Sequence, residues 1–393
     1  MTVVVNIVAS KFGGGVTVLR ALAAELARLP PRHRFVFFVS PEQADPGFPL
    51  PSHLAWRVIP LGPAGALGRL WWDQVALRRL LRREGADVLY SLGNFAMIRC
   101  PLPQLLLVQN SLYLSDLYRR VCLAHWDWRY RARYRLRRWL LRRSVAAASR
   151  VLVPSASLRE MLSREMPLPD GKVRVNYLGP GLAVTGEDAR NYRGPIRLFY
   201  PTYYGDYKNV GAALEAVRIL REQHGDRYRL VTTADLSENR NQANPQAWAR
   251  ERPLWEKLRQ QGAIESLGLV RPERMQDLYR SCHVLVWPTL AESFGFPLVE
   301  ALACGLPVVA SDIPVNRELA GDAALYFDAL APAELAAHVG EIVENAALRQ
   351  SLEERGRRRA EAFSWKRHAE QLVEILESLA RTSAARPAAP EAG

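Results

Sequence analysis

The stretch that most constrains the fold lies between residues 287 and 307. An apolar strand ends at Trp287 and is followed by a loop, a short helix and a second apolar strand that starts at Pro307. Pro297 stands where a first helical residue is favoured, because its missing N–H would have no partner there, and Gly305 supplies a helix stop. Strand, loop, helix and strand in this order predict a parallel sheet, in which ligands bind at the carboxyl ends of the strands.

The loop in this stretch suits an anion held beside a polyol. Gly295 lets the backbone approach a ligand closely, and N–H groups at a helix start have no intrahelical partner. Glu292 precedes the helix and Glu300 lies about one turn inside it, so both carboxylates can face one crevice and hold sugar hydroxyls. Taken singly, Glu300 could instead serve the helix dipole, and Glu292 could be a solvated loop residue. The Ser-Phe-Gly-Phe-Pro run between them favours a ligand site.

Residues 292–301 and 305–311 together resemble the E-x7-E segment of the retaining glycosyltransferases of family 4, which have the GT-B fold. Weaker similarity extends over residues 13–365. The resemblance implies a nucleotide-sugar donor, with Glu292 acting on the transferred sugar and Glu300 binding the nucleotide ribose. It also assigns a further group to the donor's diphosphate and sugar, mainly through the backbone: Ser293, Phe294, Gly295 and Phe296.

The chain of 393 residues, 49% of them hydrophobic, is long enough for two full cores. Apolar strands alternate with helical patterns, which predicts parallel sheets covered on both faces. With the resemblance, we expect an α/β protein of the GT-B type, in which two Rossmann-like, doubly wound domains face each other across a cleft. The expected division is residues 1–190 for an N-terminal acceptor-side domain, 195–363 for a C-terminal nucleotide-sugar-binding domain, 364–380 for a terminal helix that packs back on the N-terminal domain, and 381–393 for a disordered tail.

Apolar runs predict the positions of the strands. The basic stretch at residues 114–150 is interpreted as one long helix, and the polar stretch at residues 235–252 as a loop. The predicted strands cover residues 2–9, 34–39, 55–59, 88–91, 105–108, 151–154 and 173–177 in the first half, and residues 196–200, 228–233, 284–287, 307–310 and 325–327 in the second.

Two places in the first half follow predicted strands and carry candidate ligand contacts. Glycines at 13–15 lie between the first strand and a helix, a geometry that can cradle phosphate but that a tight turn would also explain. Family members carry a glycine pair here, so the resemblance assigns Gly14 and Gly15 to the donor. Many members have a His further on that contacts the sugar, where this chain has Gln109 and Asn110. Either amide can replace the hydrogen bonds of a neutral imidazole, but neither can accept a proton at neutral pH.

In the second half, Lys208 stands just before a helix, where its charge and the helix N-terminus can act on one anion. A surface lysine is the ordinary alternative, but the chain has only five lysines. Lys208 resembles the family lysine that stabilises the departing diphosphate, so Lys208 and Glu292 are the candidate catalytic residues. The family often has an Arg where this chain has Thr202, so either another cation serves or Lys208 and backbone amides hold the leaving group. Val270 lies in the turn that meets the nucleotide base in family members, although a strand-end valine is usually core.

The net charge of +13 is unevenly distributed, because residues 1–190 hold 28 Lys and Arg against 13 Asp and Glu, and the remainder holds 25 against 27. An aromatic and basic segment in the first half suits a surface of anionic lipids, with rings in the headgroup layer and guanidinium groups on phosphates. The alternative is a solvated helix whose aromatic residues fill the core. No nucleic acid is expected, because no binding motif is present. The segment comprises Trp126, Trp128, Tyr130, Tyr134 and Trp139 among Arg129, Arg131, Arg133, Arg135, Arg137, Arg138, Arg142 and Arg143, with Trp71, Trp72, Arg78, Arg79, Arg82 and Arg83 from an earlier helix.

Other function classes are disfavoured by what the sequence lacks. The four cysteines have no C-x-x-C spacing and no Asp-x-Asp pair occurs, so we expect no metal site, no cofactor and reduced thiols. No window approaches the roughly 18 uncharged apolar residues of a membrane span, and residues 1–10 lack the basic start of a secretion signal. The expected location is therefore the cytoplasm, with peripheral attachment to the inner face of the membrane.

The resemblance to the retaining glycosyltransferases implies a retaining, hexosyltransferase-like enzyme, expected to be metal-independent, that moves a sugar from a nucleotide-sugar donor to a glycan or lipid-linked acceptor. Its expected setting is the assembly of cell-surface polysaccharide or glycolipid. An alternative is a non-catalytic nucleotide-sugar-binding or scaffold subunit of a glycan assembly complex, which the missing His and Arg would allow. An epimerase of the same fold is disfavoured by the E-x7-E loop.

Overall fold

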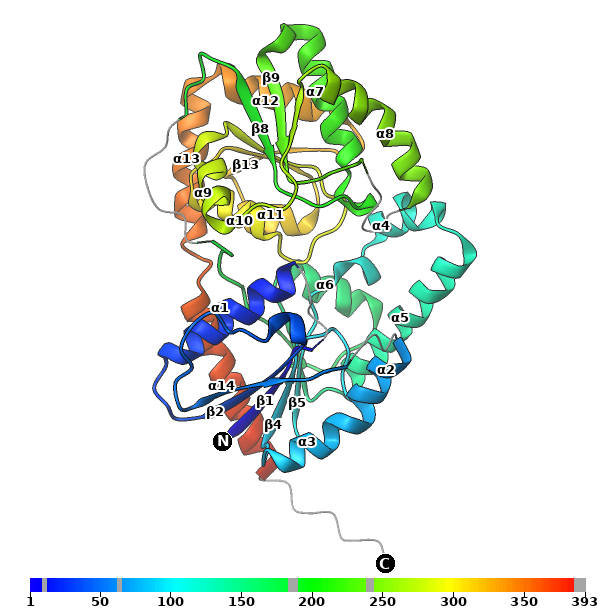
Figure 1. The fold of residues 1–393 in the computed structure, drawn as a ribbon, viewed down its shortest axis with the longest axis vertical. Coiled ribbons are helices and arrows are strands. Elements are labelled where there is room, and N and C mark those ends of the chain that lie inside the picture. Colours follow the sequence, from blue (N-terminus) through cyan, green and yellow to red (C-terminus); the bar gives the residue numbers. More distant parts are fainter. Residues whose placement is uncertain (9–12, 62–65, 183–189, 238–243, 385–393) are drawn as a thin grey trace, which may run out of the picture. The chain divides into compact units, whose positions relative to one another are not determined.

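The computed structural model of the chain describes residues 1–8, 13–61, 66–182, 190–237 and 244–384 (Figure 1). Contacts within the chain divide it into two compact units. The tail from residue 385 on and residues 9–12, which precede the glycine run, lie outside the described residues. Unit 1 comprises Met1–Tyr113, Arg133–Gly179 and Ser364–Gly393, and unit 2 comprises Leu114–Ala132 and Pro180–Phe363.

Unit 1 is built on a sheet of seven strands in the order β3-β2-β1-β4-β5-β6-β7, and every neighbouring pair is parallel. Because β1 lies between β2 and β4, the chain winds outward from β1 in both directions, as in a doubly wound sheet. The strands are β1 (Thr2–Asn6), β2 (Arg34–Val39), β3 (Leu54–Val58), β4 (Val88–Ser91), β5 (Gln104–Leu107), β6 (Arg150–Val153) and β7 (Val173–Val175).

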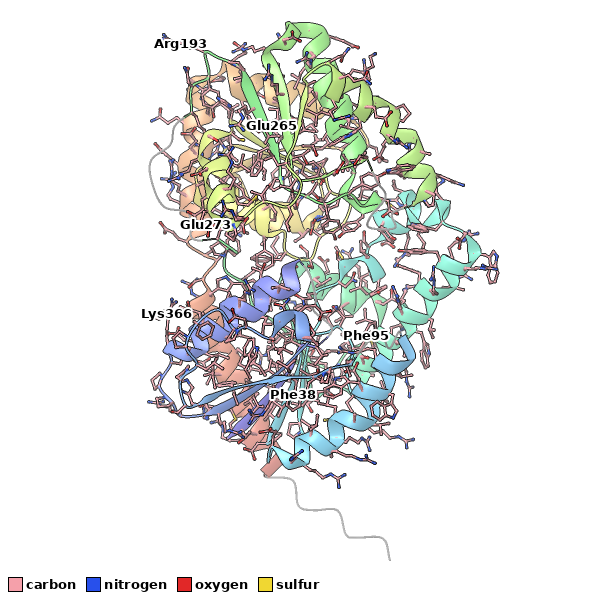
Figure 2. All side chains as sticks on the ribbon, in the orientation of Figure 1. Phe38, Phe95, Arg193, Glu265, Glu273 and Lys366 are labelled. Carbon is pink, nitrogen blue, oxygen red and sulfur yellow. The ribbon has the colours of Figure 1, made fainter. Side chains whose placement is uncertain are left out.

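Helices bury their apolar faces against the sheet of unit 1. Trp72, Leu77 and Leu81 share one hydrophobic core with Val4 and Phe38, and Figure 2 labels Phe38 among the side chains of this unit. Helix α1 packs against α14, which also contacts β4. The helices are α1 (Gly14–Arg28), α2 (Ala66–Trp71), the π-helical turn η2 (Trp72–Ala76), α3 (Leu77–Arg83), α6 (Ala156–Glu165), α14 (Trp365–Ala384) and, from residue 133 on, α5 (Trp128–Ala147).

Unit 2 repeats the same plan with six parallel strands in the order β10-β9-β8-β11-β12-β13. Helix α7 packs against α12 and β9, and α10 packs against α13. The two sheets confirm the expected fold class, an α/β protein with two Rossmann-like parallel sheets. The strands are β8 (Ile196–Tyr200), β9 (Tyr228–Thr232), β10 (Ile264–Ser266), β11 (Val284–Trp287), β12 (Val308–Ser311) and β13 (Ala324–Phe327). The principal helices are α4 (Asp116–Val121), α7 (Val210–His224), α8 (Pro245–Gln260), α9 (Pro272–Ser281), α10 (Phe296–Ala303), α11 (Pro314–Ala320), α12 (Pro332–Glu344) and α13 (Ala346–Ala360).

The prediction of one helix over residues 114–150 is wrong, because this stretch forms α4, a short 3-10 turn and α5. Ser115 caps α4, its hydroxyl oxygen accepting a hydrogen bond from the Tyr118 N–H at 3.1 Å. The Asp127 carboxylate accepts the N–H of Tyr130 at 2.7 Å at the start of α5. Each of these side chains satisfies a backbone donor at a helix start, so the chain breaks there despite a uniformly basic composition.

The predicted loop at residues 235–252 is also wrong, because α8 begins at Pro245. The Asn244 side-chain oxygen accepts the N–H groups of Gln246 and Ala247 at 2.9 and 3.3 Å. Asparagine before proline is a favourable helix start, but the polar composition of the helix hides its periodicity. The three-residue strand β10 has too few residues to show a pattern and is missing from the sequence-based prediction.

The units differ from the expected boundary near residue 190. Leu114–Ala132 comes from the first half of the sequence but belongs to unit 2. The first half of the chain therefore supplies part of the packing of unit 2. The terminal helix α14 lies in unit 1, with the N-terminal strands.

Candidate active site

The candidate site of unit 2 lies where the winding of the sheet reverses. Strands β8 and β11 are neighbours, with Leu198 paired to Val284, while β9 continues the sheet beyond β8 and β12 beyond β11. Ligands of such sheets bind outside the carboxyl ends of these two strands. The loops after β8 and β11 meet there, because the Leu290 N–H donates to the Tyr207 carbonyl at 2.8 Å.

Lys208 and Glu292, one from each loop, form a buried ion pair. The Lys208 Nζ lies 2.6 Å from Glu292 Oε1, and the two side chains are 10% and 11% exposed. The rings of Tyr203, Tyr207 and Trp287 surround the same ammonium, with centroids 5.5, 5.0 and 5.2 Å from Nζ. Such rings attract a cation and exclude water from it.

The charge of Lys208 is maintained by its surroundings. Burial by itself would lower the pKa of Lys208, but the Glu292 carboxylate, together with the hydroxyl groups of Tyr203 and Tyr200, raises that pKa above its ordinary value. Lys208 is therefore protonated at neutral pH and presents a fixed positive charge at the end of β8.

Helix α10 begins beside this pair. Gly295 has φ 76° and ψ 67°, a left-handed conformation that favours glycine, and its carbonyl accepts the N–H groups of Leu298 and Val299 at 3.0 and 3.4 Å. The helix starts at Phe296, so Pro297 is its second residue and not the first as predicted. The N–H groups ahead of Leu298 lie outside the helical ladder, where they suit an anion.

Phe294 contributes its ring to the core and not to the site. It is buried, and its ring lies 5.4 Å from that of Phe296 and 5.7 Å from that of Phe363. Ser293 and Phe296 are half-buried beside it. Any donor contact of Phe294 must therefore come from its backbone, as the sequence predicts.

Glu300 is 6% exposed and has partners of its own. Its Oε2 accepts the Tyr279 hydroxyl at 2.6 Å, and its Oε1 accepts the Gly181 N–H at 3.1 Å. Burial raises the pKa of Glu300 to about 7, although these two hydrogen bonds lower it. The two carboxylates are thus held differently, Glu292 by an ammonium and Glu300 by neutral donors.

The turn that carries Lys208 has a scaffold that the sequence does not reveal. The Asp206 carboxylate accepts the Trp126 indole N–H at 2.7 Å and the Tyr207 N–H at 3.0 Å. Trp126 also stacks on Tyr130, with ring centroids 3.7 Å apart and planes 13° from parallel. Because Trp126 and Asp206 are 80 residues apart in the chain, no local pattern signals their contact.

Asn209 links the two loops of the site. Its backbone is left-handed, with φ 55°, and its side-chain amide donates to the carbonyls of Pro288 and Ala329 at 2.9 and 2.8 Å. The Tyr200 hydroxyl donates to the carbonyl of Lys208. Asparagine tolerates this backbone conformation better than most residues, so Asn209 after Lys208 is a signal that the sequence does contain.

Thr202, which stands where the family often has an arginine, serves the backbone. Its N–H donates to the Thr233 hydroxyl oxygen at 2.8 Å, and that hydroxyl donates back to the Thr202 carbonyl at 2.7 Å. Thr202 is buried, and the pairing joins the ends of β8 and β9. Among the described contacts of Thr202, none brings a second cation to this position.

Val270 is half-buried between the fully exposed Leu269 and the start of α9, and Gly268 before it has φ 62°. The turn is thus present where a nucleotide base is expected. The role of Val270 stays a prediction.

The candidates of unit 1 carry no titratable group. Gly14 and Gly15 are the first two residues of α1, and the carbonyl of Gly13 accepts the Val16 N–H at 3.0 Å. Gln109 follows β5, with its side-chain amide 3.4 Å from the Leu92 carbonyl. The Asn110 side chain closes a local turn, since its oxygen accepts the Leu112 N–H at 3.0 Å. The side-chain amide of Gln109 is thus held by a longer hydrogen bond to the backbone than that of Asn110.

The aromatic and basic segment divides between core and surface. Trp72 is buried, with its indole N–H on Asn6, and Tyr134 is buried, with its hydroxyl on the Leu112 carbonyl. Trp126 and Tyr130 support the Lys208 turn. The aromatic residues that remain exposed are Trp71, Trp128 and Trp139, at 56%, 68% and 56%. In the described part of the chain, no helix combines the length and apolarity that a membrane crossing requires.

Comparisons with known proteins agree with this architecture. A model of Glycosyltransferase Family 4 matches residues 12–184, and a model of Glycosyl transferases group 1 matches residues 188–359. The two models match successive parts of the chain, which therefore belongs to the family 4 glycosyltransferases with the GT-B fold.

Among curated relatives, O-antigen chain mannosyltransferase B of Escherichia coli is 31% identical over 183 residues, covering 46% of each chain. O-antigen chain mannosyltransferase RfbU of Salmonella typhimurium is 24% identical over 191 residues, covering 48% of this chain and 49% of its own. The chain thus spans about half the length of the curated relatives that it matches.

Solved structures share the fold over nearly the whole chain. Sucrose-phosphate synthase from Thermosynechococcus elongatus has a TM-score of 0.75 at 18% identity, covering 97% of this chain and 100% of its own. WaaG, a glycosyltransferase involved in lipopolysaccharide biosynthesis, has a TM-score of 0.70 at 16% identity, covering 96% and 99%. Anabaena HepE in complex with UDP-glucose has a TM-score of 0.67 at 16% identity, covering 96% and 100%.

Proposed function

We propose that this protein is a retaining glycosyltransferase that moves a sugar from a nucleotide-sugar donor to a glycan or lipid-linked acceptor in cell-surface polysaccharide or glycolipid assembly. The observation that carries the proposal is the buried Lys208–Glu292 pair, 2.6 Å apart, where the winding of the sheet of unit 2 reverses. The mannosyltransferase names of the curated relatives make mannose the first sugar to test, and the UDP-glucose complex of HepE supports a nucleotide-sugar donor.

Lys208 would stabilise the departing diphosphate. Its charge is present at neutral pH, because its pKa is raised, and three aromatic rings shield it from water. A fixed cation in a desolvated site stabilises charge that develops on the leaving group without reorganising solvent. The backbone N–H groups ahead of α10 would share the same phosphate oxygens.

Glu292 would position both Lys208 and the sugar. Its Oε1 is occupied by Lys208, whereas its Oε2 accepts no hydrogen bond from a described residue. We assign this second oxygen to a hydroxyl of the transferred sugar, because a carboxylate can accept several hydrogen bonds at once. Glu292 would then fix the distance between the sugar and the Lys208 ammonium, which stabilises the departing phosphate.

Glu300 would hold the nucleotide ribose. Each of its oxygens already accepts one hydrogen bond, and each can accept another from a ribose hydroxyl. The Tyr279 and Gly181 donors keep the carboxylate oriented before the nucleotide arrives.

Retention requires the acceptor to attack the face of the sugar that the nucleotide leaves. The bond from the anomeric carbon to the phosphate oxygen breaks as the bond to the acceptor oxygen forms. Because neither Gln109 nor Asn110 can accept a proton at neutral pH, the acceptor proton would pass to the departing phosphate. The reaction as proposed uses no metal and no cofactor.

The exposed part of the aromatic and basic segment supports peripheral attachment to the cytoplasmic face of an anionic membrane. Trp139 and Leu136 are exposed on α5 among exposed arginines, an arrangement that suits the headgroup layer. Binding should appear with anionic vesicles at low ionic strength, where charges are least screened. Absence of binding to such vesicles would refute the proposed membrane attachment.

The test of the proposal is a panel of nucleotides and nucleotide-sugars. A ligand that binds the native state raises the apparent melting temperature by mass action, so a thermal shift identifies the donor. Donor hydrolysis or transfer by the purified protein would then distinguish an enzyme from a non-catalytic subunit. The intact Lys208–Glu292 pair favours the enzyme. The anomeric configuration of the product, read by NMR, decides between retention and inversion. Absence of both a shift and turnover would refute the proposal.

A further inference from the structure

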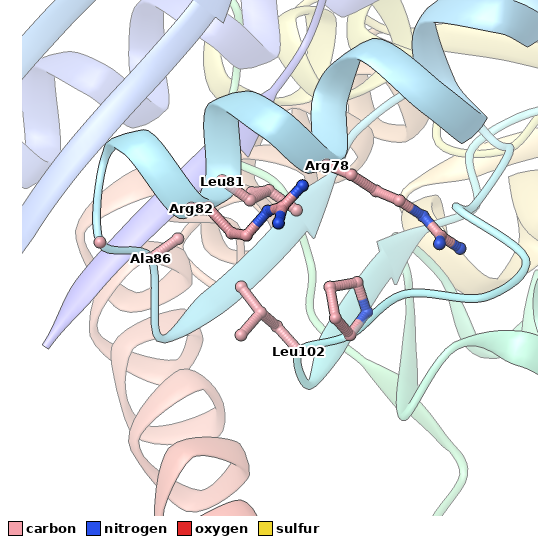
Figure 3. A pocket seen from close by; sticks show the side chains of 7 residues that line it. Arg78, Leu81, Arg82, Ala86 and Leu102 are labelled. Atoms are coloured by element: carbon pink, nitrogen blue, oxygen red, sulfur yellow. The ribbon is translucent and has the colours of Figure 1, made fainter.

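A cavity of about 530 Å³ opens on unit 1, away from the strand ends that carry the candidate site residues (Figure 3). Part of its wall is the turn just before β4, and another part is the loop just before β5, so the cavity lies at the amino ends of these strands. Gln109 and Asn110, by contrast, follow the carboxyl end of β5. The lining residues are Arg78, Leu81, Arg82, Gly85, Ala86, Pro101 and Leu102.

The rim of the cavity is cationic. The Arg78 guanidinium donates to the Arg99 carbonyl, and its Nε is buried without a hydrogen-bond partner in the described structure. Arg82 is exposed one turn further along α3 and forms no ion pair with a described carboxylate. The neighbouring Glu84 is already engaged by Arg34 at 2.9 Å and Arg57 at 3.3 Å. The two rim arginines are therefore not neutralised by the acid that follows them in the chain.

The floor of the cavity is apolar. Leu81, Ala86 and Leu102 contribute the apolar part of the lining, and Figure 3 shows Leu81 on α3 and Leu102 on the loop opposite. Two carbonyls near the end of α3 already accept hydrogen bonds. The Gly85 N–H donates to the Arg82 carbonyl at 3.1 Å, and the Ala86 N–H donates to the Leu81 carbonyl at 3.0 Å. A cationic rim over an apolar floor fits an amphiphile with a phosphate better than a fully hydrated anion.

The same helical stretch exposes apolar side chains further toward its start. Leu70, Trp71 and Val75 are 46%, 56% and 44% exposed. Trp71, Val75 and Arg82 are exposed along this stretch and Arg78 is half-buried, so the stretch presents a mixed aromatic and basic surface. A stretch of this kind lies in the plane of a membrane surface, with tryptophan among the headgroups.

We infer that this cavity binds the phosphodiester headgroup of an anionic phospholipid, with Arg78 and Arg82 on the phosphate and Leu81, Ala86 and Leu102 beneath the glycerol. The inference rests on the membrane attachment proposed above and sharpens it from a charged surface to one built site. Its residues are separate from Lys208, Glu292 and Glu300, which belong to unit 2.

Vesicle flotation of the full chain tests the inference. The probes are vesicles of phosphatidylcholine alone, and of phosphatidylcholine and phosphatidylglycerol in equal amounts. Arg82→Ala should lower the partition coefficient on the anionic vesicles roughly fivefold, the effect of one basic residue at the surface. Arg82→Lys should lose most of this binding too, because lysine keeps the charge but cannot grip a phosphate with two parallel hydrogen bonds. Ala86→Phe, which fills the cavity without changing charge, should have a similar effect.

The matched control is Arg159→Ala, which removes an exposed arginine from α6, outside the cavity. Equal losses for Arg82→Ala and Arg159→Ala, with Arg82→Lys at the wild-type level, would show general charge attraction and overturn the site. Competition by inorganic phosphate at the concentration of the lipid phosphate would overturn the lipid as the occupant.

The same protein samples are melted with and without the nucleotide-sugar panel. Unchanged melting of the variants shows that they fold. Nucleotide binding without vesicle binding would overturn the lipid site and leave the proposed transferase intact. Vesicle binding that depends on Arg82 in a protein that binds no nucleotide would support the lipid site and refute the donor site.

Discussion

Units 1 and 2 share a sheet plan but differ in what their strand ends carry. Six strands follow the same order in both, β3-β2-β1-β4-β5-β6 in unit 1 and β10-β9-β8-β11-β12-β13 in unit 2. In unit 2, the loops after β8 and β11 hold the buried Lys208–Glu292 pair. In unit 1, the candidate residues that follow β1 and β5 are the glycines Gly14 and Gly15 and the amides Gln109 and Asn110, and the arginines of α3 and α5 lie largely at the surface.

The difference teaches that the fold provides the place and the loops provide the chemistry. A buried ion pair is weak evidence for stability, because desolvation of both charges offsets their attraction and an apolar replacement is often neutral. Lys208 and Glu292 are therefore better explained by a ligand than by the needs of the fold. Unit 1 needs no such pair if its task is to receive an acceptor.

The largest effect expected is that of Lys208→Ala. Removing one preorganised electrostatic stabiliser should lower donor turnover roughly 100-fold or more, since the leaving diphosphate then lacks its cation. Steady-state assays of donor hydrolysis and transfer measure the loss. Lys257→Ala, which removes an exposed lysine of α8 in the same unit, is the control and should leave turnover unchanged. If folded Lys208→Ala turns over the donor at the wild-type rate, Lys208 does not stabilise the leaving diphosphate. The proposed functional difference between the units would then lose its main support.

Glu300→Gln should weaken nucleotide binding about tenfold, the effect of losing a charged hydrogen-bond acceptor. In the wild type, affinity should fall as pH drops from about 8 to about 6, because protonation of a carboxyl whose pKa is about 7 removes the acceptor for ribose. Calorimetry across this range measures both effects, and Glu300→Gln should show little pH dependence. The control is Glu273→Gln on the exposed surface of α9 (Figure 2). Equal affinity and an equal pH profile in Glu300→Gln would reject the ribose assignment.

How far the sequence predicts this structure depends on whether a signal is local. Apart from the three-residue strand β10, the strand positions and the helix stop at Gly305 can be predicted, because apolar runs and a glycine act on neighbouring residues. Gly305 has φ 61°, its N–H donates to the Leu302 carbonyl at 2.9 Å, and a Cβ there would lie 2.5 Å from the Arg357 guanidinium carbon. Lys208 and Glu292 are likewise found by their places after strands.

Side-chain contacts between residues far apart in the chain cannot be predicted from the sequence. The sequence predicts Lys208 on phosphate and Glu292 on sugar, but not that the two bind each other in the described structure. Tyr279 on α9 meets Glu300 on α10, 21 residues further along the chain, and no local pattern signals this contact. The capping residues at Ser115 and Asn244 carry a local signal that a polar, basic composition masks.

Trp126→Phe should give the smallest of these effects and sharpens the comparison most, because Trp126 comes from the first half of the chain but belongs to unit 2. Phenylalanine keeps a ring against Tyr130 but removes the N–H that lies 2.7 Å from Asp206. Loss of one hydrogen bond of about 1 kcal/mol should lower kcat about fivefold through a looser Lys208 turn, with the donor KM nearly unchanged.

The matched control is Trp128→Phe, two residues away and 68% exposed, which should match the wild type. A purely structural role for Trp126 would lower the melting temperature and leave the kcat of the folded enzyme unchanged. If kcat falls at an unchanged melting temperature, and Asp206→Asn has the same effect, then Trp126 acts through the Lys208 turn. The division of labour between the units would then include one side chain that the first half of the chain supplies to the donor site.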